Sequence, residues 1–137
     1  MKDVMILVGA GQIGMAIARR MGFGMKIVVG DYKLENAESV AQTMNNAGSD
    51  VRPLQMDLSS RESILATITE AQKHGEISML VNAAGLSPSQ APIEAILKVD
   101  LYGTAVLLEE VGKVIPAGRR GRHDFESVRT PHACAER

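Results

Sequence analysis

The chain has 137 residues, the length of one domain, and 45% of them are hydrophobic, which suffices for a buried core. A net charge of -1 and an aromatic content of 3% argue against a nucleic-acid-binding surface, and the single cysteine, Cys134, excludes a disulfide framework and any metal site built from several cysteines. No apolar run approaches the roughly 20 residues that span a membrane, so we expect a cytoplasmic protein.

Short apolar runs alternate along the chain with stretches whose apolar residues recur at helical spacing. The runs cover residues 4–8, 26–29, 51–56 and 77–81, and each is typical of a buried parallel strand. The apolar positions of the first three predicted helices are Ile13, Ala16, Ile17 and Met21; Leu34, Ala37, Val40, Ala41 and Met44; and Ile64, Leu65, Ile68 and Ala71. This alternation predicts an α/β fold with a doubly wound parallel sheet of four strands, and right-handed crossovers give the order 3-2-1-4.

A long fourth helix is predicted to begin at Pro92, which suits a first helical turn. Its apolar positions are Ile93, Ile96, Leu97, Val99, Leu101, Val106, Leu107, Val111 and Val114. The predicted domain covers residues 1–115.

A glycine-rich turn follows the first strand, with Gly9, Gly11 and Gly14 in the spacing G-x-G-x-x-G. This spacing is typical of the dinucleotide-binding turn of a Rossmann-type domain. The first glycine permits the tight turn, the second lets the backbone approach a pyrophosphate, and the third lets the helix pack closely on the strand. The phosphates would lie on the first amides of that helix, at Gln12 and Ile13. Glycines also mark ordinary turns, so the motif needs support from the other strand ends.

Acidic residues end the second and third strands at the same edge of the sheet. Asp31 follows Gly14 by 17 residues, where a carboxylate can accept from both ribose hydroxyls; the alternative is a loop or helix-capping aspartate. A carboxylate there repels a 2′-phosphate, so NAD is favoured over NADP, and Lys33 softens the preference. Asp57 fits two roles about equally, a contact to the adenine edge and a charge at the start of the next helix.

These stretches together resemble the short-chain dehydrogenase/reductase family. The resemblance rests on G-A-G-Q-I-G at residues 9–14, Asp31, M-D-L-S-S at residues 56–60 and N-A-A-G at residues 82–85. In addition, L-K-V-D-L-Y-G-T at residues 97–104 is similar to that family's fourth helix, and the whole resemblance covers about residues 3–115. It implies hydride transfer between NAD or NADP and an alcohol or carbonyl carbon of a small-molecule substrate.

The resemblance also implies which residues meet the cofactor. Asp57 and Leu58 would border the adenine, and the N-A-A-G residues would support the central strand and line the cleft. The full implied set is Gly9, Gly11, Gln12, Ile13, Gly14, Asp31, Tyr32, Asp57, Leu58, Asn82, Ala83, Ala84 and Gly85. A homo-oligomer through the fourth helix is implied too, and we expect Val106, Leu107 and Val111 to be exposed.

Two positions depart from the family's pattern. The usual glycine turn is one residue longer than residues 9–14. Asp100 occupies the place where the fourth helix of the family carries an asparagine that holds a water of the proton relay. An aspartate can hold a water as well, but its charge would alter the relay.

The family's catalytic tyrosine, with a lysine four residues later, has no counterpart in these 137 residues. Tyr32 is followed at that spacing by Asn36, and Tyr102 by Val106. The catalytic serine expected after a fifth strand is also missing, because no hydrophobic strand precedes Ser127. We therefore expect a truncated and inactive form; the alternative is a non-catalytic NAD(H)-binding or sensing module.

The composition changes at Pro116. Residues 116–137 lack hydrophobic periodicity and hold five arginines and two histidines, which is typical of a disordered basic tail or, less often, of a phosphate-binding or nucleic-acid-binding patch. However, reading the possible codons from their second base permits a string from Gly118 that includes G-G-V-G-V-T-I-S-S. That string has the glycine turn, the β-branched strand and the serines of the family's fifth strand. We therefore hypothesise a frameshift near Pro116, which resequencing of the DNA would test.

Overall fold

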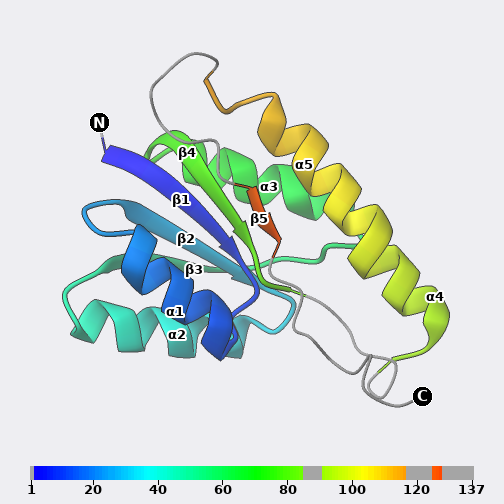
Figure 1. Cartoon of the computed structure of the whole chain (residues 1–137), viewed down its shortest axis with the longest axis horizontal. Coiled ribbons are helices and arrows are strands. Elements are labelled where there is room, and N and C mark those ends of the chain that lie inside the picture. The colour runs from blue at the N-terminus through cyan, green and yellow to red at the C-terminus, as the bar shows by residue number, and fades with distance from the viewer. Residues whose placement is uncertain (1, 85–90, 117–124, 128–137) are drawn as a thin grey trace.

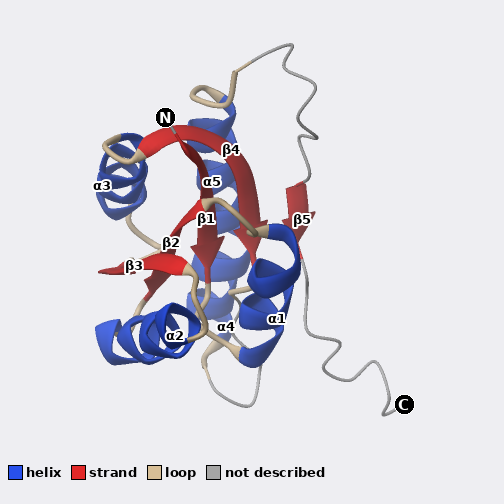
Figure 2. Ribbon diagram, turned by 90° about the vertical axis from the view of Figure 1, so that its left-hand side faces the viewer, coloured by secondary structure: helices blue, strands red, loops and turns tan. Residues whose placement is uncertain are grey.

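The computed structural model describes residues 2–84, 91–116 and 125–127 (Figure 1). Its parallel strands form one sheet in the order β3-β2-β1-β4-β5 (Figure 2). The strands are β1 Lys2–Val8, β2 Lys26–Asp31, β3 Asp50–Gln55, β4 Gly75–Asn82 and β5 Phe125–Ser127. The helices are α1 Gln12–Met21, α2 Leu34–Asn46, α3 Arg61–Gln72, α4 Ile93–Ile96 and α5 Thr104–Gly112, with a π-helical segment η1 Leu97–Gly103 between the last two. The predicted α/β class and the order 3-2-1-4 of the first four strands are confirmed.

The central strand β1 is buried on both of its faces. Val4 and Ile6 point into a core shared with α3 and α5, while Met5 and Leu7 point into a second core shared with α1 and α2. Figures 1 and 2 show these helix pairs on opposite sides of the sheet. Because successive side chains of a strand alternate between the two faces, a strand covered on both sides needs an unbroken apolar run. This is why the first run was readable from the sequence.

A short fifth strand, which the sequence pattern did not predict, lies beside the four predicted strands. Phe125, Glu126 and Ser127 pair in parallel with Leu80, Val81 and Asn82 at the end of β4. An edge strand presents unpaired amide and carbonyl groups that favour pairing with any extended backbone. Such pairing needs no hydrophobic run, so the sequence pattern did not indicate it. The remainder of the predicted tail lies outside the described residues.

The predicted fourth helix also differs from expectation. It begins one residue after Pro92, but its middle is the π-helical segment η1. Val106, Leu107 and Val111, which we expected to be exposed, are at most 3% exposed and belong to the core with α3. The expectation was wrong because this face of α5 covers the sheet within the same chain. Another side of the α4–η1–α5 stretch carries the exposed apolar residues, which are Ile93, Leu97, Leu101, Tyr102 and Leu108.

Two further helices differ from the prediction at individual positions. In α1 the fully buried residues are the small Gly14 and Ala18, which lie where the helix is closest to the strands, while the predicted Ile17 and Met21 are partly buried against the core and Ile13 is exposed. In α3, Leu65 is exposed and Thr67 is buried. The Thr67 hydroxyl donates to the carbonyl of Ser63 at 3.1 Å, which makes its burial tolerable.

An ion-pair network joins α3 to α5. Glu110 is 8% exposed, and its carboxylate accepts hydrogen bonds from Arg61 and, at 3.1 Å, from Lys113. Arg61 also reaches the exposed Glu109 at 3.3 Å. The hydrogen bond from Lys113 holds the pKa of Glu110 below its ordinary value of 4.5, with Arg61 assisting and burial opposing. A lowered folded pKa means that ionised Glu110 stabilises the fold above that ordinary value and loses this contribution as the pH falls below it.

We expect the Glu110→Gln variant to be less stable than the native chain at neutral pH, and the difference to shrink as the pH falls below 4.5. Urea denaturation at neutral pH and at about pH 3 measures the two free energies of unfolding. Glu109→Gln is the matched control, since Glu109 lies on the same helix with its side chain 55% exposed, and should differ little from the native chain. A Glu110 difference that is the same at both pH values would contradict the prediction.

Candidate functional site

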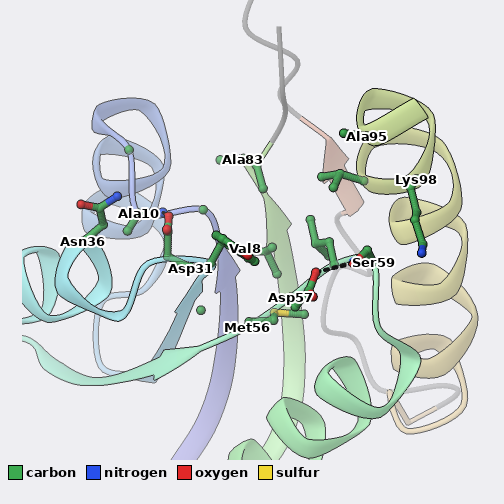
Figure 3. A pocket seen from close by; sticks show the side chains of 17 residues that line it. Val8, Ala10, Asp31, Asn36, Met56, Asp57, Ser59, Ala83, Ala95 and Lys98 are labelled. Carbon is green, nitrogen blue, oxygen red and sulfur yellow. Dashed lines mark hydrogen bonds between the residues drawn. The ribbon is translucent and has the colours of Figure 1, made fainter. Parts of the chain in front are cut away.

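A cavity of about 740 Å³ lies at the carboxyl ends of the strands (Figure 3). Its lining residues come from strands β1 and β2, from the loops that follow the first four strands, from the first turn of α2, and from the α4–η1 stretch. They are Val8, Gly9, Ala10, Gly11, Gly30, Asp31, Tyr32, Asn36, Met56, Asp57, Leu58, Ser59, Ala83, Ala84, Ala95, Lys98 and Val99. In doubly wound sheets this edge is where ligands bind.

The glycine turn is built from glycines that serve different purposes. Gly9 has φ +97°, and a Cβ on it would stand 2.7 Å from the amide nitrogen of Ala84. A Cβ on Gly14 would stand 2.8 Å from the carbonyl oxygen of Gly9 and 3.1 Å from the Cβ of Ala83. Both glycines are therefore required for the turn and α1 to sit against the end of β4.

Gly11 is different, because the protein itself does not require a glycine there. Its φ is -96°, and a Cβ built on it would meet nothing within 4 Å. As the N-cap of α1 it provides no side-chain hydrogen bond, and α1 has no acidic residue in its first turn. The first amides of α1 therefore have no side-chain cap and carry the positive end of the helix dipole beside an open space. This combination suits an anion that approaches the backbone closely.

Asp31 lies at the end of β2 beside the glycine turn (Figure 3). Its Oδ2 accepts a hydrogen bond from the amide of Ala10 at 2.8 Å, and its Oδ1 accepts from the amide of Lys33 at 2.9 Å. The carboxylate is thus fixed by two backbone donors from different loops. Each oxygen still has a second lone pair, so both can accept a hydroxyl of a ligand as well.

Asp57 lies at the end of β3 and is held by the start of α3. Its Oδ1 accepts from both the amide and the hydroxyl of Ser59, at 2.9 and 2.6 Å, and its own amide donates to the hydroxyl of Ser63 at 2.9 Å. Ser60 is the N-cap of α3 and accepts from the Ser63 amide. These bonds fit the role of a charge at the helix start, and Asp57 also lines the cavity, so both predicted roles remain compatible with its position.

The N-A-A-G residues connect β4 to β1 and to α5. The Ala83 amide donates to the carbonyl of Val8 at 2.7 Å. Asn82 is 6% exposed; its Nδ2 donates to the Thr104 hydroxyl at 3.3 Å, and its Oδ1 accepts from the Ala84 amide at 3.3 Å. Asn82 thus supports the cavity wall from behind, while Ala83 and Ala84 line it. Gly85 lies outside the described residues.

The cavity does not include every predicted residue. Gln12, Ile13 and Gly14 lie in α1 behind the turn, and Asn82 lies beneath the wall. Tyr32 and Leu58 line the cavity, the first largely exposed and the second buried. Asp100, predicted at the relay position, is half-buried on η1 and does not line it.

Several lining residues were not predicted from the sequence, chiefly Asn36, Ser59, Ala95, Lys98 and Val99. Lys98 extends from η1 across the cavity from Asp31 (Figure 3). Asn36 lies in the first turn of α2, five residues after the end of β2 at Asp31. Its closeness in sequence to a predicted site residue was a signal that could have indicated it. No sequence signal marks Lys98 or Val99, because only the packing of η1 against the strand ends turns them inward.

Among the described helices, none combines the length and the hydrophobicity that a bilayer-spanning segment requires.

Comparison with known proteins gives a consistent result. The chain matches the model of the short chain dehydrogenases over residues 2–122. It is 36% identical over 117 residues to the short-chain dehydrogenase/reductase bsc3 of Alternaria brassicicola, a match that covers 85% of this chain and 43% of that protein. It is 36% identical over 87 residues to the 3-oxoacyl-(acyl-carrier-protein) reductase FabG of Pseudomonas aeruginosa, covering 61% and 35%. The chain therefore spans less than half the length of these curated relatives.

Solved structures share the fold. A short-chain dehydrogenase/reductase from Burkholderia phymatum in complex with NAD has a TM-score of 0.73 at 22% identity, covering 83% of this chain and 44% of that one. A variant of actinorhodin polyketide ketoreductase with NADPH has a TM-score of 0.72 at 24% identity, covering 82% and 47%. Since the family match extends over most of the chain, this protein belongs to the short-chain dehydrogenases.

Proposed function

We propose that the chain binds NAD or NADP in the cavity at the strand ends. In this proposal it forms the cofactor-binding part of a cytoplasmic oxidoreductase that transfers hydride between the nicotinamide and an alcohol or carbonyl carbon of a small molecule. The observation that carries the proposal is Gly11, which lies next to the uncapped start of α1. Neither its backbone conformation nor the space around it requires a glycine at this position. The pyrophosphate would lie on the amides of Gly11, Gln12 and Ile13, the adenosine ribose at Asp31 and the adenine near Asp57 and Leu58.

The structures of relatives with NAD and with NADPH support a nicotinamide dinucleotide without favouring one of the two. We propose NAD, because the carboxylate of Asp31 would repel a 2′-phosphate. Its two backbone donors fix it beside the turn, so it cannot swing away without losing both hydrogen bonds. Lys33 donates with its amide and offers its side chain as a weak compensating charge.

We expect calorimetric titration to give tighter binding of NAD than of NADP, and Asp31→Ser to reduce this preference by about tenfold or more, which is about 1.4 kcal/mol. The ratio of the two affinities is the decisive quantity, because it removes effects that a substitution has on both cofactors alike. Asp57→Asn removes the same charge from the neighbouring strand end and should leave the ratio nearly unchanged. Tighter binding of NADP by the native chain would contradict the assignment of Asp31.

We further propose that this 137-residue chain binds the cofactor without turnover. The proposal rests on the absence from its sequence of a tyrosine with a lysine four residues later, since Tyr32 and Tyr102 lack that partner. The hypothesised frameshift near Pro116 would account for the missing pair. An assay of the purified chain with an alcohol and NAD tests this by the absorbance of the NADH formed. Formation of NADH that depends on the protein would overturn the proposal that the chain has no turnover.

The second candidate function is a non-catalytic module that senses NAD(H). The same missing pair favours it, because a sensor needs the strand-end cavity but no proton donor. The reading frame of the DNA around the codon for Pro116 distinguishes the two proposals. A sensor requires that independent reads of the region around Pro116 show one intact frame. The frameshifted enzyme requires that they show a shift into the frame that encodes the string G-G-V-G-V-T-I-S-S in place of the present tail.

We also propose that a second copy of the chain covers an exposed apolar strip on the α4–η1–α5 stretch. The strip consists of Ile93, Leu97, Leu101 and Leu108, each at least 42% exposed. We expect light scattering to give a dimer and Leu101→Lys to shift it towards the monomer. Leu65→Lys, at an exposed leucine of α3, is the matched control and should leave the dimer intact. A native chain that stays monomeric at high concentration would overturn this proposal.

A further inference from the structure

The carboxylate of Asp31 makes a contact that its expected ribose role does not explain. Its Oδ2 accepts the amide hydrogen of Ala10, a residue 21 positions earlier in the chain, at 2.8 Å. Ala10 is the middle residue of the glycine turn, between Gly9 and Gly11. A group that served the ribose alone would have no need to hold the turn. Figure 3 shows Asp31 and Ala10 side by side at the wall of the cavity.

The end of β2 holds two consecutive amides of the turn. The amide of Gly9 donates to the carbonyl of Gly30 at 2.8 Å, and the amide of Ala10 donates to the carboxylate of Asp31. In α1, the amide of Met15 donates to the carbonyl of the N-cap residue Gly11 at 3.1 Å, which is the first backbone bond of the helix. The amides of Gly9 and Ala10 are thus held by the end of β2, while the amides that follow them at the start of α1 have no side-chain cap. The bond to Asp31 fixes the peptide plane between Gly9 and Ala10, one peptide before that of Gly11.

The second oxygen of Asp31 extends this arrangement to α2. Oδ1 accepts from the amide of Lys33, the N-cap residue of α2, which has no side-chain cap of its own. One side chain therefore joins the end of β2, the glycine turn and the start of α2. Hydrogen bonds from backbone amides to a carboxylate are charge-assisted and are roughly twice as strong as neutral ones.

We propose that Asp31 is a positioning residue for the phosphate-binding turn in addition to its ribose contact. This inference rests on the proposed dinucleotide function. By holding Ala10, Asp31 keeps the turn in the conformation that directs the amides of Gly11 and the first turn of α1 at the pyrophosphate. Because the turn is ordered before the ligand arrives, binding avoids the cost of ordering it. Loss of Asp31 therefore weakens the phosphate contact even where no ribose hydroxyl is present.

A ligand without ribose hydroxyls separates the two roles. The probes are NAD and an NAD analogue whose adenosine ribose lacks both the 2′- and the 3′-hydroxyl, titrated calorimetrically into the native chain, Asp31→Ala and Asp31→Asn. We expect Asp31→Ala to weaken binding of the dideoxy analogue by about tenfold, the scale of one charge-assisted hydrogen bond. Asp31→Asn, whose amide oxygen can still accept from Ala10, should restore part of that loss. Equal affinity of the native chain and Asp31→Ala for the dideoxy analogue would overturn the proposal.

The ligand-free protein provides a second test that does not depend on the proposed function. Amide hydrogen exchange followed by NMR should be at least about tenfold faster at Ala10 in Asp31→Ala than in the native chain, and intermediate in Asp31→Asn. Asp57→Ala removes a carboxylate from the neighbouring strand end and should leave the rate at Ala10 unchanged. If the native chain binds neither dinucleotide, the proposed function fails while the exchange rates still decide the positioning role. An Ala10 rate that Asp31→Ala does not change would overturn that role.

Discussion

The Gly9→Ala variant is expected to lose about 3 kcal/mol of unfolding free energy, because two costs of similar size add. The first is conformational, since φ at this position is +97°, where residues with a Cβ are strained. The second is steric, since the added Cβ would stand 2.7 to 2.9 Å from three backbone atoms of Ala83 and Ala84. Backbone atoms cannot move aside like the end of a flexible side chain, so the end of β4 must shift.

Gly48 provides the matched control for this prediction. Its φ of +95° is nearly the same, but a Cβ there would meet nothing within 4 Å. Gly48→Ala should therefore cost only the conformational part, about 1.5 kcal/mol. Urea denaturation of both variants and the native chain measures the difference. Equal losses at the two glycines would contradict the close contact between the turn and the end of β4.

The Gly11→Ala variant is expected to have the opposite profile, with binding lost and stability kept. Its added methyl group meets nothing in the protein, so the free energy of unfolding should change by no more than about 0.5 kcal/mol. The same methyl group occupies the space through which a pyrophosphate would approach the backbone. We therefore expect the affinity for NAD to fall at least about tenfold, which is about 1.4 kcal/mol.

Gly112 is the control for this second prediction. A Cβ on Gly112 also meets nothing within 4 Å, but this residue ends α5 and does not line the cavity. Gly112→Ala should leave the affinity for NAD unchanged. Calorimetric titration of NAD into the three proteins gives the affinities. Binding by Gly11→Ala that equals the native value would show that the ligand does not approach the turn at this glycine.

The sequence predicts the sheet well because burial on both faces leaves a local mark. Residues 4–8 of strand β1 need an apolar side chain at every position, and the glycine turn that follows must satisfy local geometry at Gly9 and close packing at Gly14. Both requirements concern residues close in sequence. The strand order then follows from the handedness of the crossovers.

What the sequence could not predict depends on contacts between distant elements. Val106, Leu107 and Val111 carry the same hydrophobicity as Leu97 and Leu101, and only the position of α3 decides that the first group is buried. The three residues of β5 have no pattern of their own, because their place depends on the free edge of β4.

The candidate site divides in the same way. Gly9, Gly11, Asp31 and Asp57 were predicted, because each lies at the end of a strand or within three residues after it, and the ends of parallel strands meet at one edge. Asn36, Lys98 and Val99 were not, because they reach the cavity from helices whose packing the sequence does not specify. The hydrogen bond between Asp31 and Ala10 could not be predicted either, because it joins two loops 21 residues apart and no sequence pattern marks the pair.

We propose above that a nicotinamide dinucleotide binds this chain on the glycine turn and along the strand ends. An NMR titration of the isotope-labelled native chain with NAD tests it most directly, because each amide reports its own surroundings. We expect the amide signals of Gly11, Gln12 and Ile13 to shift progressively and saturably, together with that of Lys33 beside Asp31, while Gly48 at the opposite edge of the sheet stays unchanged. Unchanged signals at Gly11, Gln12 and Ile13 at saturating NAD would contradict the claim.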